Sequence, residues 1–212
     1  MTRRQAVDPQ NPDQRVINEV AALIQQGGLV VLPTDTAYGL AGDPQNPTVV
    51  NRVLTVKRRV GKPGMPLLVA SLAQARRFGN FSKLAEALAT RFWPGALTLV
   101  VPTHHTFPTG ILGPQNSLAL RIPNHPVALA VIQTLKAPVI GTSANKSTAP
   151  SPRSAEAAIA QMGDAVDLVL DAGPTPLSKD STIINCTITP PEILRRGALP
   201  VATLRPLLDF QE

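Results

Sequence analysis

Apolar residues recur along the 212-residue chain with two spacings, one typical of amphipathic helices and one of short buried strands. Helical spacing follows six expected helix starts, at Asn11, Asn46, Ser71, Ser82, His125 and Ser154. Three of these residues precede a proline, which is favoured in the first turn of a helix. Apolar runs that predict strands cover residues 29–33, 65–70, 96–101, 117–123, 137–142, 166–171, 181–187 and 192–197.

Helices and strands alternate in the first part of the chain, whereas strands cluster toward its end. This order predicts an α/β fold in which helices flank a sheet of mixed parallel and antiparallel strands. No linker-like composition or internal repeat interrupts the pattern. We therefore expect a single domain over residues 1–212.

Composition narrows the class of protein. Hydrophobic residues make up 43% and aromatic residues 3% of the chain, so its core must consist mainly of Val, Ile, Leu and Ala. A net charge of +6, from 20 basic and 14 acidic residues, suits an anionic partner such as a nucleotide or RNA, but it also suits a merely soluble surface. The single cysteine, Cys186, excludes an internal disulfide. Since the sequence shows no membrane-length apolar run and no signal-peptide pattern, we expect a cytoplasmic protein without membrane spans.

Polar residues collect where predicted strands end. The clusters are Thr34-Asp35-Thr36 with Tyr38, Lys57 with Arg59, Arg121, the run from Gly141 to Ser147, Ser181-Thr182, and Arg195-Arg196. Because ligands bind beyond strand ends in open α/β sheets, this arrangement predicts one pocket assembled from distant segments. Arg121 lies between apolar neighbours in a strand, where a buried arginine is expected to face a carboxylate or a cavity.

Several of these clusters also have a simpler interpretation. Thr34-Asp35-Thr36 could form only a turn, Lys57 and Arg59 could only complement a helix C-terminus, and Ser143 and Asn145 could be turn residues. The sequence contains neither a Walker loop nor a GxGxxG motif, and no spacing of His, Cys or carboxylates indicates a metal site. We expect His104-His105 at the surface, His125 at a helix start rather than as a base, and Trp93 in the core.

Seven motifs, read in order, resemble those of the YrdC-type threonylcarbamoyl-AMP synthases: "PTDTAYGL", "KRR", "FWPGALTLV", "LALRIPNHP", "IGTSANKS", "STII" and "ILRRGA". They span about residues 28–198. The resemblance implies a twisted α/β sheet around a deep, positively charged cavity. It also implies a nucleotidyltransferase that condenses L-threonine, bicarbonate and ATP to threonylcarbamoyl-AMP and pyrophosphate, for modification of tRNAs that read ANN codons.

The family's signature Lys-x-Arg…Ser-x-Asn is represented by Lys57, Arg59, Ser143 and Asn145. By position, the resemblance implies ATP contacts at these four residues and at Ser117, Ser151 and Arg195, and threonine contacts at Thr36, Arg121, Gly141 and Ser181. Mg²⁺ would arrive with ATP rather than in a site built by the protein. The implied partner beyond the substrates is tRNA or a downstream threonylcarbamoyl-transfer complex. The residue types fit, since a triphosphate needs cations and Arg121 can hold the threonine carboxylate.

The chain departs from the family pattern in two places. The run "RRVGKPGMPL" is longer than is common in the family, so no contact is assigned between Val60 and Ala70. Gly61 and Gly64 would permit a lid in this segment. Arg196 follows Arg195 directly, which leaves open which of the two faces the nucleotide.

Two other functions compete with the synthase. A non-catalytic relative could use the basic cavity to bind RNA or assist ribosome maturation. The signature set and the scarcity of aromatic residues for stacking on bases argue against that function. A related enzyme of metal-centre maturation is generally fused to zinc-finger and acylphosphatase-like domains, for which this sequence has no counterpart.

Overall fold

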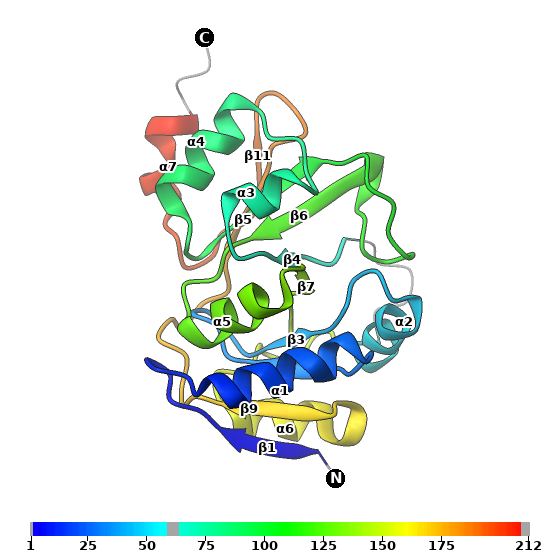
Figure 1. Cartoon of the computed structure of the whole chain (residues 1–212). Helices are drawn as coiled ribbons and strands as arrows, with labels where there is room; N and C mark the ends of the chain where they lie inside the picture. Colours follow the sequence, from blue (N-terminus) through cyan, green and yellow to red (C-terminus); the bar gives the residue numbers. More distant parts are fainter. Residues whose placement is uncertain (1, 59–63, 209–212) are drawn as a thin grey trace.

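Two mixed sheets form the frame of the protein, which a computed structural model describes over residues 2–58 and 64–208 (Figure 1). The five-stranded sheet has the order β1 (Arg3–Ala6), β9 (Leu168–Asp171), β2 (Val30–Leu32), β3 (Gly39–Ala41) and β8 (Thr142–Ser143). The six-stranded sheet has the order β11 (Glu192–Arg195), β10 (Thr182–Asn185), β5 (Leu97–Pro102), β6 (Ser117–Arg121), β4 (Leu67–Leu68) and β7 (Val139–Ile140). Each sheet contains parallel and antiparallel pairs, so the predicted mixed α/β fold is confirmed, with its strands divided between two sheets.

Helices cover both faces of the five-stranded sheet. Val30 and Leu32 of β2 share a buried cluster with α1 (Gln14–Gln25) and α5 (Pro126–Leu135). Val31, whose side chain points the opposite way, shares the other cluster with α2 (Pro47–Val56) and α6 (Ala155–Met162). Burial on both faces explains why this strand has a continuous apolar sequence instead of an alternating one.

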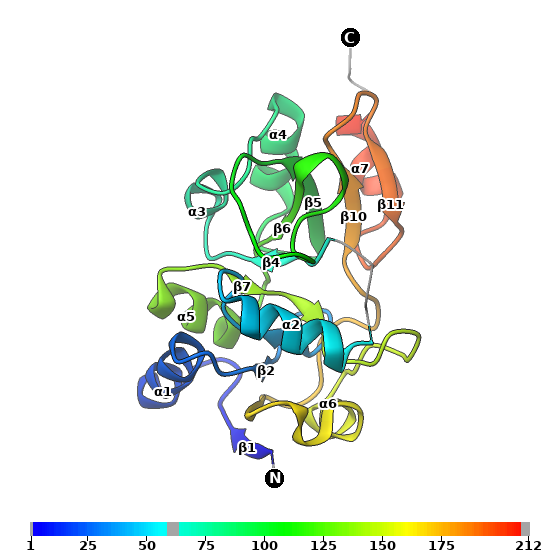
Figure 2. The same cartoon turned by 90° about the vertical axis from the view of Figure 1, so that its right-hand side faces the viewer.

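The six-stranded sheet carries its own helices, α3 (Leu72–Arg76), α4 (Lys83–Phe92) and α7 (Val201–Leu208). Figure 2 shows these helices grouped around β5, β6, β10 and β11, at the opposite end of the molecule from β1. Two short 3₁₀ segments, at Pro114–Asn116 and Gly163–Ala165, complete the described secondary structure. The sequence pattern did not predict β1, because β1 is largely exposed and begins Arg-Arg-Gln. This segment forms a strand by pairing with β9.

Side-chain caps confirm five of the six expected helix starts. Asn46, Ser71, Ser82, His125 and Ser154 each accept a hydrogen bond from a backbone N–H of the helix that follows. The expected cap at Asn11 is wrong, because Asp13 performs that role and accepts from the Arg15 amide at 2.8 Å.

The three histidines have the predicted locations. His125 Nδ1 accepts from the Val127 amide at 3.3 Å, and burial lowers the pKa of His125, which favours the neutral ring that can accept. His104 and His105 are exposed. Trp93 is only partly buried, but it packs against the core and donates from Nε1 to the Leu97 carbonyl at 2.7 Å.

Gly141 is the point where the chain passes from one sheet to the other. The predicted single strand over residues 137–142 is instead two strands, β7 and β8, separated by this glycine. Its amide donates to the Pro66 carbonyl at 2.7 Å, and a Cβ at this position would lie 2.5 Å from Leu68 Cγ. Only glycine allows this approach without displacing Leu68, so the crossing brings residues 142–145 to the junction of the two sheets.

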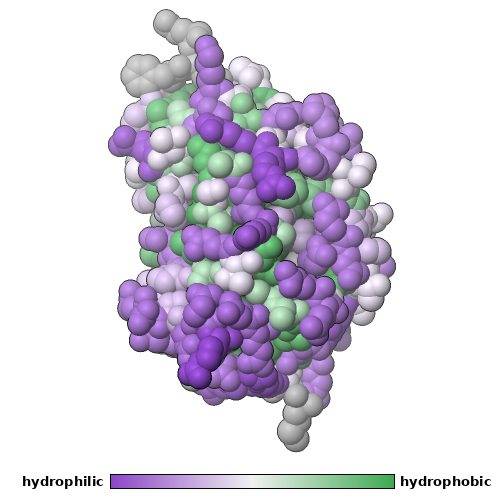
Figure 3. Space-filling view, in the orientation of Figure 1, coloured by the Kyte–Doolittle hydropathy of each residue, from purple (hydrophilic) through white to green (hydrophobic). Residues whose placement is uncertain are grey.

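On the face shown in Figure 3, hydrophilic residues predominate and apolar ones are scattered between them. In the described part of the chain, three large apolar side chains are exposed by more than a third, namely Leu177, Ile188 and Leu194. Within residues 2–58 and 64–208, no helix is long and apolar enough to cross a membrane.

Candidate functional site

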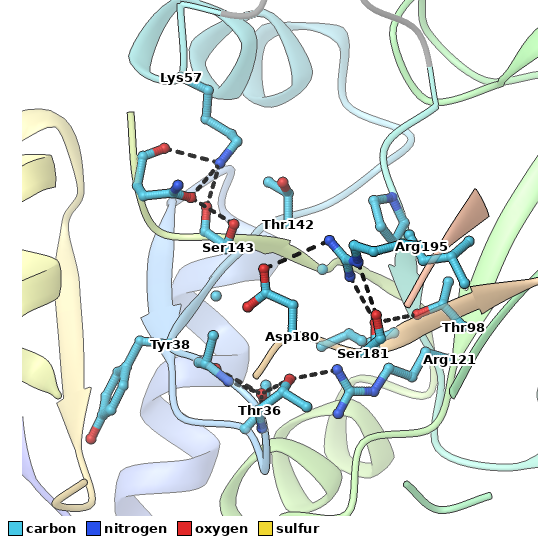
Figure 4. Close-up of a pocket in the computed structure, with 18 of the residues that line it drawn as sticks. Thr36, Tyr38, Lys57, Thr98, Arg121, Thr142, Ser143, Asp180, Ser181 and Arg195 are labelled. Atoms are coloured by element: carbon cyan, nitrogen blue, oxygen red, sulfur yellow. Dashed lines mark hydrogen bonds and ion pairs between the residues drawn. The ribbon is translucent and has the colours of Figure 1, made fainter. Parts of the chain in front are cut away.

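Residues from both sheets line a cavity of about 340 Å³ (Figure 4). Its walls come from the ends of β2, β5, β6, β10 and β11, from the C-terminus of α2, and from the crossing at Gly141. The charged side chains that line it, among the described residues, are Lys57, Arg121, Arg195 and Asp180. Three cations against one carboxylate give the wall a positive balance, which suits an anionic ligand.

The turn after β2 is both a hydrogen-bonded turn and part of the cavity wall, which are the two interpretations that its sequence allowed. Thr34 Oγ1 holds the turn together, since it donates to the Ala37 carbonyl at 2.7 Å and accepts from the Thr36 and Ala37 amides at 3.2 and 3.1 Å. Thr36 instead directs its hydroxyl toward Arg121 at the cavity wall (Figure 4). The turn therefore fixes the orientation of a hydroxyl that faces the cavity.

The phenol of Tyr38 lies outside the cavity. Figure 4 shows the ring directed away from the cavity, and its hydroxyl donates to the Gly173 carbonyl at 2.5 Å and accepts from the Ala172 amide at 3.1 Å. Burial raises the pKa of Tyr38 to about 12, so the phenol stays protonated at neutral pH. This side chain serves packing and hydrogen bonding within the fold.

Arg121 meets a carboxylate and the cavity at once, as its position in an apolar strand predicted. Its side chain is 7% exposed and donates from Nη2 to Asp35 Oδ1 at 2.5 Å, from Nη1 to Thr36 Oγ1 at 2.7 Å and from Nε to the Gly95 carbonyl at 2.9 Å. Burial lowers the pKa of Arg121, and Asp35 opposes this shift. Bonds to described residues use three of the five guanidinium N–H donors, which leaves two for a ligand.

Lys57 joins the end of α2 to the loop after β8. Its ammonium donates to the Ser143 carbonyl at 2.5 Å, the Asn145 carbonyl at 3.0 Å and Asn145 Oδ1 at 3.1 Å. Ser143 Oγ donates to the same Oδ1 at 2.6 Å, and Asn145 Nδ2 donates to the Ala149 carbonyl at 2.5 Å. Three signature residues thus form one hydrogen-bonded unit at the cavity wall, in which Lys57 holds the end of β8, with Ser143, and the loop after it, with Asn145.

A second group of charged residues surrounds Asp180, just before β10. Its Oδ1 accepts from Arg153 Nη2 and its Oδ2 from Ser151 Oγ, each at 3.0 Å. Arg195 Nη1 lies 3.7 Å from Oδ2, while Arg195 Nε and Nη2 donate to the carbonyl and hydroxyl of Ser181 at 2.9 and 3.0 Å. Arg153 also donates to the Thr36 carbonyl, so this group links the turn after β2 to the six-stranded sheet.

The structure brings together most of the residues that the sequence singled out. Those that line the cavity are Thr36, Lys57, Arg121, Gly141, Ser143, Asn145, Ser181 and Arg195. Ser117 and Ser151 do not line it: Ser117 is buried where β6 begins, and Ser151 reaches the cavity only through Asp180. Arg195 lines the wall and Arg196 does not. Arg59 and most of the longer segment after it, residues 60–63, lie outside the described residues.

The sequence patterns did not single out Thr98, Asp180 or Arg153. Asp180 directly precedes a predicted strand, so the rule that located the other polar clusters also applies to it. Thr98 lies inside an apolar strand and bonds Ser181 Oγ at 2.8 Å, a contact that depends on strand order. Arg153 lies in a Ser/Pro-rich loop with no distinguishing pattern.

Buried polar atoms in the site are satisfied by the protein itself. Among the described residues, no buried side-chain nitrogen or oxygen lacks a hydrogen-bond partner. The same part of the chain contains no group of three His, Cys, Asp or Glu residues that could hold a metal ion. The arrangement is therefore suited to binding and orienting polar ligands by hydrogen bonds and charge.

Comparison with known proteins places these features in a family. A family model described as telomere recombination, and named for Sua5, YciO and YrdC, matches residues 22–197. A threonylcarbamoyl-AMP synthase of Pyrococcus abyssi is 35% identical over 193 residues, which are 91% of this chain and 57% of that protein. This chain thus spans little more than half the length of that relative. A threonylcarbamoyl-AMP synthase of Alkalilimnicola ehrlichii is 32% identical over 78% of this chain and 86% of its own length.

A solved structure agrees with the sequence comparisons. The crystal structure of P. abyssi Sua5 complexed with L-threonine superposes with a TM-score of 0.92 and 33% identity. The superposition covers 97% of this chain and 61% of the Sua5 chain. The two-sheet frame described above is therefore also that of the threonine complex.

Proposed function

The chain belongs to the Sua5/YciO/YrdC family, and from this premise we propose that it is a threonylcarbamoyl-AMP synthase. It joins L-threonine, bicarbonate and ATP, and it releases pyrophosphate, which makes it a nucleotidyltransferase. The observation that carries the proposal is the cavity in which the Lys57–Ser143–Asn145 unit faces the Arg121–Thr36 pair. The first belongs to the family's signature, and the second suits an amino acid.

The amino-acid end of the cavity is formed by Arg121, Thr36 and Ser181. The two remaining N–H donors of Arg121 suit a carboxylate, which forms strong charge-assisted hydrogen bonds with guanidinium. Thr36 and Ser181 also line the cavity, and their hydroxyls suit the polar groups of threonine. The threonine named in the Sua5 complex supports this proposal.

The nucleotide end is formed by Arg195 and the signature unit. Arg195 supplies a planar cation for phosphate oxygens, and Lys57 supplies positive charge while it holds Ser143 and Asn145 in place. Arg59, Ser117 and Ser151 are proposed as further ATP contacts, and Gly141 as a further threonine contact, on the family resemblance. Mg²⁺ would enter bound to the phosphates of ATP.

The protein contributes positioning and charge neutralisation to the reaction. The threonine amine and bicarbonate form a carbamate with loss of water. A carbamate oxygen then attacks the α-phosphorus of ATP, and pyrophosphate leaves. The cationic residues of the wall stabilise the charge that develops on the phosphates. The matched range of residues 22–197 includes strands of both sheets, which supports a single catalytic domain. The product would pass to a tRNA-modifying partner.

Pyrophosphate release from ATP and bicarbonate, measured with and without L-threonine, tests the function. We expect threonine-dependent release from the wild type. Arg195→Gln should raise the KM for ATP at least about tenfold, since it removes a charge-assisted contact. Arg196→Gln is the matched control, because this neighbouring cation is exposed and does not line the cavity.

Two results would count against the proposal. If folded wild-type protein released no pyrophosphate in response to threonine, the synthase would be excluded and RNA binding would become the next assay. If Arg195→Gln and Arg196→Gln raised the KM for ATP equally, the cavity would not be the nucleotide site.

A further inference from the structure

Asp180 is the one carboxylate among the described residues that line the cavity. We propose that Asp180 binds the α-ammonium group of the amino-acid substrate while Arg121 holds its carboxylate. The inference rests on the proposed function and adds to it the residue that recognises the amine.

The carboxylate of Asp180 is fixed in place by its neighbours. Arg153 Nη2 and Ser151 Oγ each donate to one of its oxygens at 3.0 Å, and the side chain remains 31% exposed. Figure 4 shows this carboxylate directed into the cavity, among the residues proposed for substrate binding. Because its orientation is already fixed, Asp180 can meet a ligand without reordering its own side chain.

The carboxylate has unused capacity for a donor. An ionised carboxylate offers about four acceptor positions, and the hydrogen bonds from Arg153 and Ser151 use two of them. Arg195 Nη1, at 3.7 Å from Oδ2, contributes charge rather than a hydrogen bond. Asp35 differs from Asp180 in both respects. Its side chain is only 5% exposed, and its Oδ1 accepts hydrogen bonds from Arg121 and from the Asn124 amide.

Charge complementarity points to an ammonium as the ligand group. A free amino acid carries a carboxylate and an ammonium on one carbon, so its site needs a cation and an anion close together. Arg121 and Asp180 both line the cavity, and Asp180 is near enough to raise the pKa of Arg121, although burial outweighs this effect. Without Asp180, an entering ammonium would meet only Lys57, Arg121 and Arg195 among the charged lining groups described, and all three would repel it.

Calorimetric titration with two ligands tests the proposal directly. One ligand is L-threonine, and the other is 2,3-dihydroxybutanoate, which replaces the ammonium with a hydroxyl. We expect the wild type to prefer threonine at least about tenfold, because a hydrogen bond to a charged group is lost in the analogue. Asp180→Asn should abolish this preference, whereas Asp180→Glu should retain part of it. Asp43→Asn, outside the cavity, is the matched control and should keep the full preference.

Each other outcome overturns the inference in a distinguishable way. If Asp180→Asn weakened both ligands by the same factor, Asp180 would act only by positioning Arg153 and Arg195, and the ammonium contact would be excluded. If wild-type protein preferred neither ligand, the contact would also be excluded, while the binding of threonine itself would stand. If wild-type protein bound no threonine, the proposed function would fail together with the inference.

Discussion

Replacement of Lys57 by methionine tests whether this signature residue holds the Ser143–Asn145 loop. Methionine has a similar length and no charge, so the substitution removes the ammonium and keeps much of the packing. In the folded protein Lys57 is 4% exposed and donates to three oxygens of the loop. If these bonds hold the loop in place, their loss must lower the stability of the whole protein.

The size of the effect depends on which of the three oxygens keep another hydrogen-bond donor in Lys57→Met. The Ser143 carbonyl still accepts from the Asn145 amide at 2.9 Å, and Asn145 Oδ1 still accepts from Ser143 Oγ at 2.6 Å. The Asn145 carbonyl has no second donor among the described residues, so the variant leaves one buried acceptor unpaired. Such a group costs about 1–3 kcal/mol. For a chain of this size, a loss of about 2 kcal/mol lowers Tm by about 4–8 °C.

Thermal unfolding followed by circular dichroism measures this change, with Lys146→Met as the matched control. Lys146 lies in the same loop, is exposed, and takes part in the hydrogen-bond network only through its backbone. We expect a clear fall in Tm for Lys57→Met and little change for Lys146→Met. If both variants unfolded within about 2 °C of the wild type, the assigned role of Lys57 would be refuted.

Two further predictions concern groups away from the cavity. Arg52 donates to both oxygens of Asp167, at 2.7 and 2.9 Å, and this hydrogen bonding lowers the pKa of Asp167 below its usual 3.8. The resulting stabilisation is present above pH 3.8 and is lost as pH falls through the lower pKa of the folded protein. On acidification below pH 3.8, the Tm of Asp167→Asn should therefore fall less than the Tm of the wild type. Burial raises the pKa of Cys186 to about 12, so we expect iodoacetamide at pH 8 to alkylate the native thiol more than about tenfold more slowly than the thiol in urea; equal rates would contradict the assigned burial.

Local signals in the sequence predicted α1 to α6, because a helix start is decided by neighbouring residues, but they did not predict α7. Asn46, with Pro47 after it, caps α2 as expected. The error at Asn11 has the same local origin, since Asp13 lies two residues further along and competes for the same role. By contrast, β1 became a strand only through its pairing with β9, about 165 residues away. No window along the sequence contains that information.

Most of the cavity residues were also predictable, because polar residues at the ends of apolar strands have few structural reasons to be there; Thr98 and Asp180 were not predicted. The direction in which each of these side chains points was not predictable. Tyr38 and Thr36 belong to one motif, yet the turn held by Thr34 directs Thr36 toward the cavity and leaves the Tyr38 phenol bonded to Gly173. Such directions depend on backbone geometry that residue identity does not specify.

The signature set illustrates the same limit and suggests why its members occur together. The sequence alone predicts Lys57 as a cation for phosphates and Ser143 and Asn145 as separate ATP contacts. In the structure one ammonium bonds the backbone and side chain of the loop that presents the other two, across 86 and 88 positions in sequence. Loss of Lys57 would therefore also release Ser143 and Asn145. These three residues of the set are best understood as one structural element, in which Lys57 secures Ser143 and Asn145 at the cavity wall.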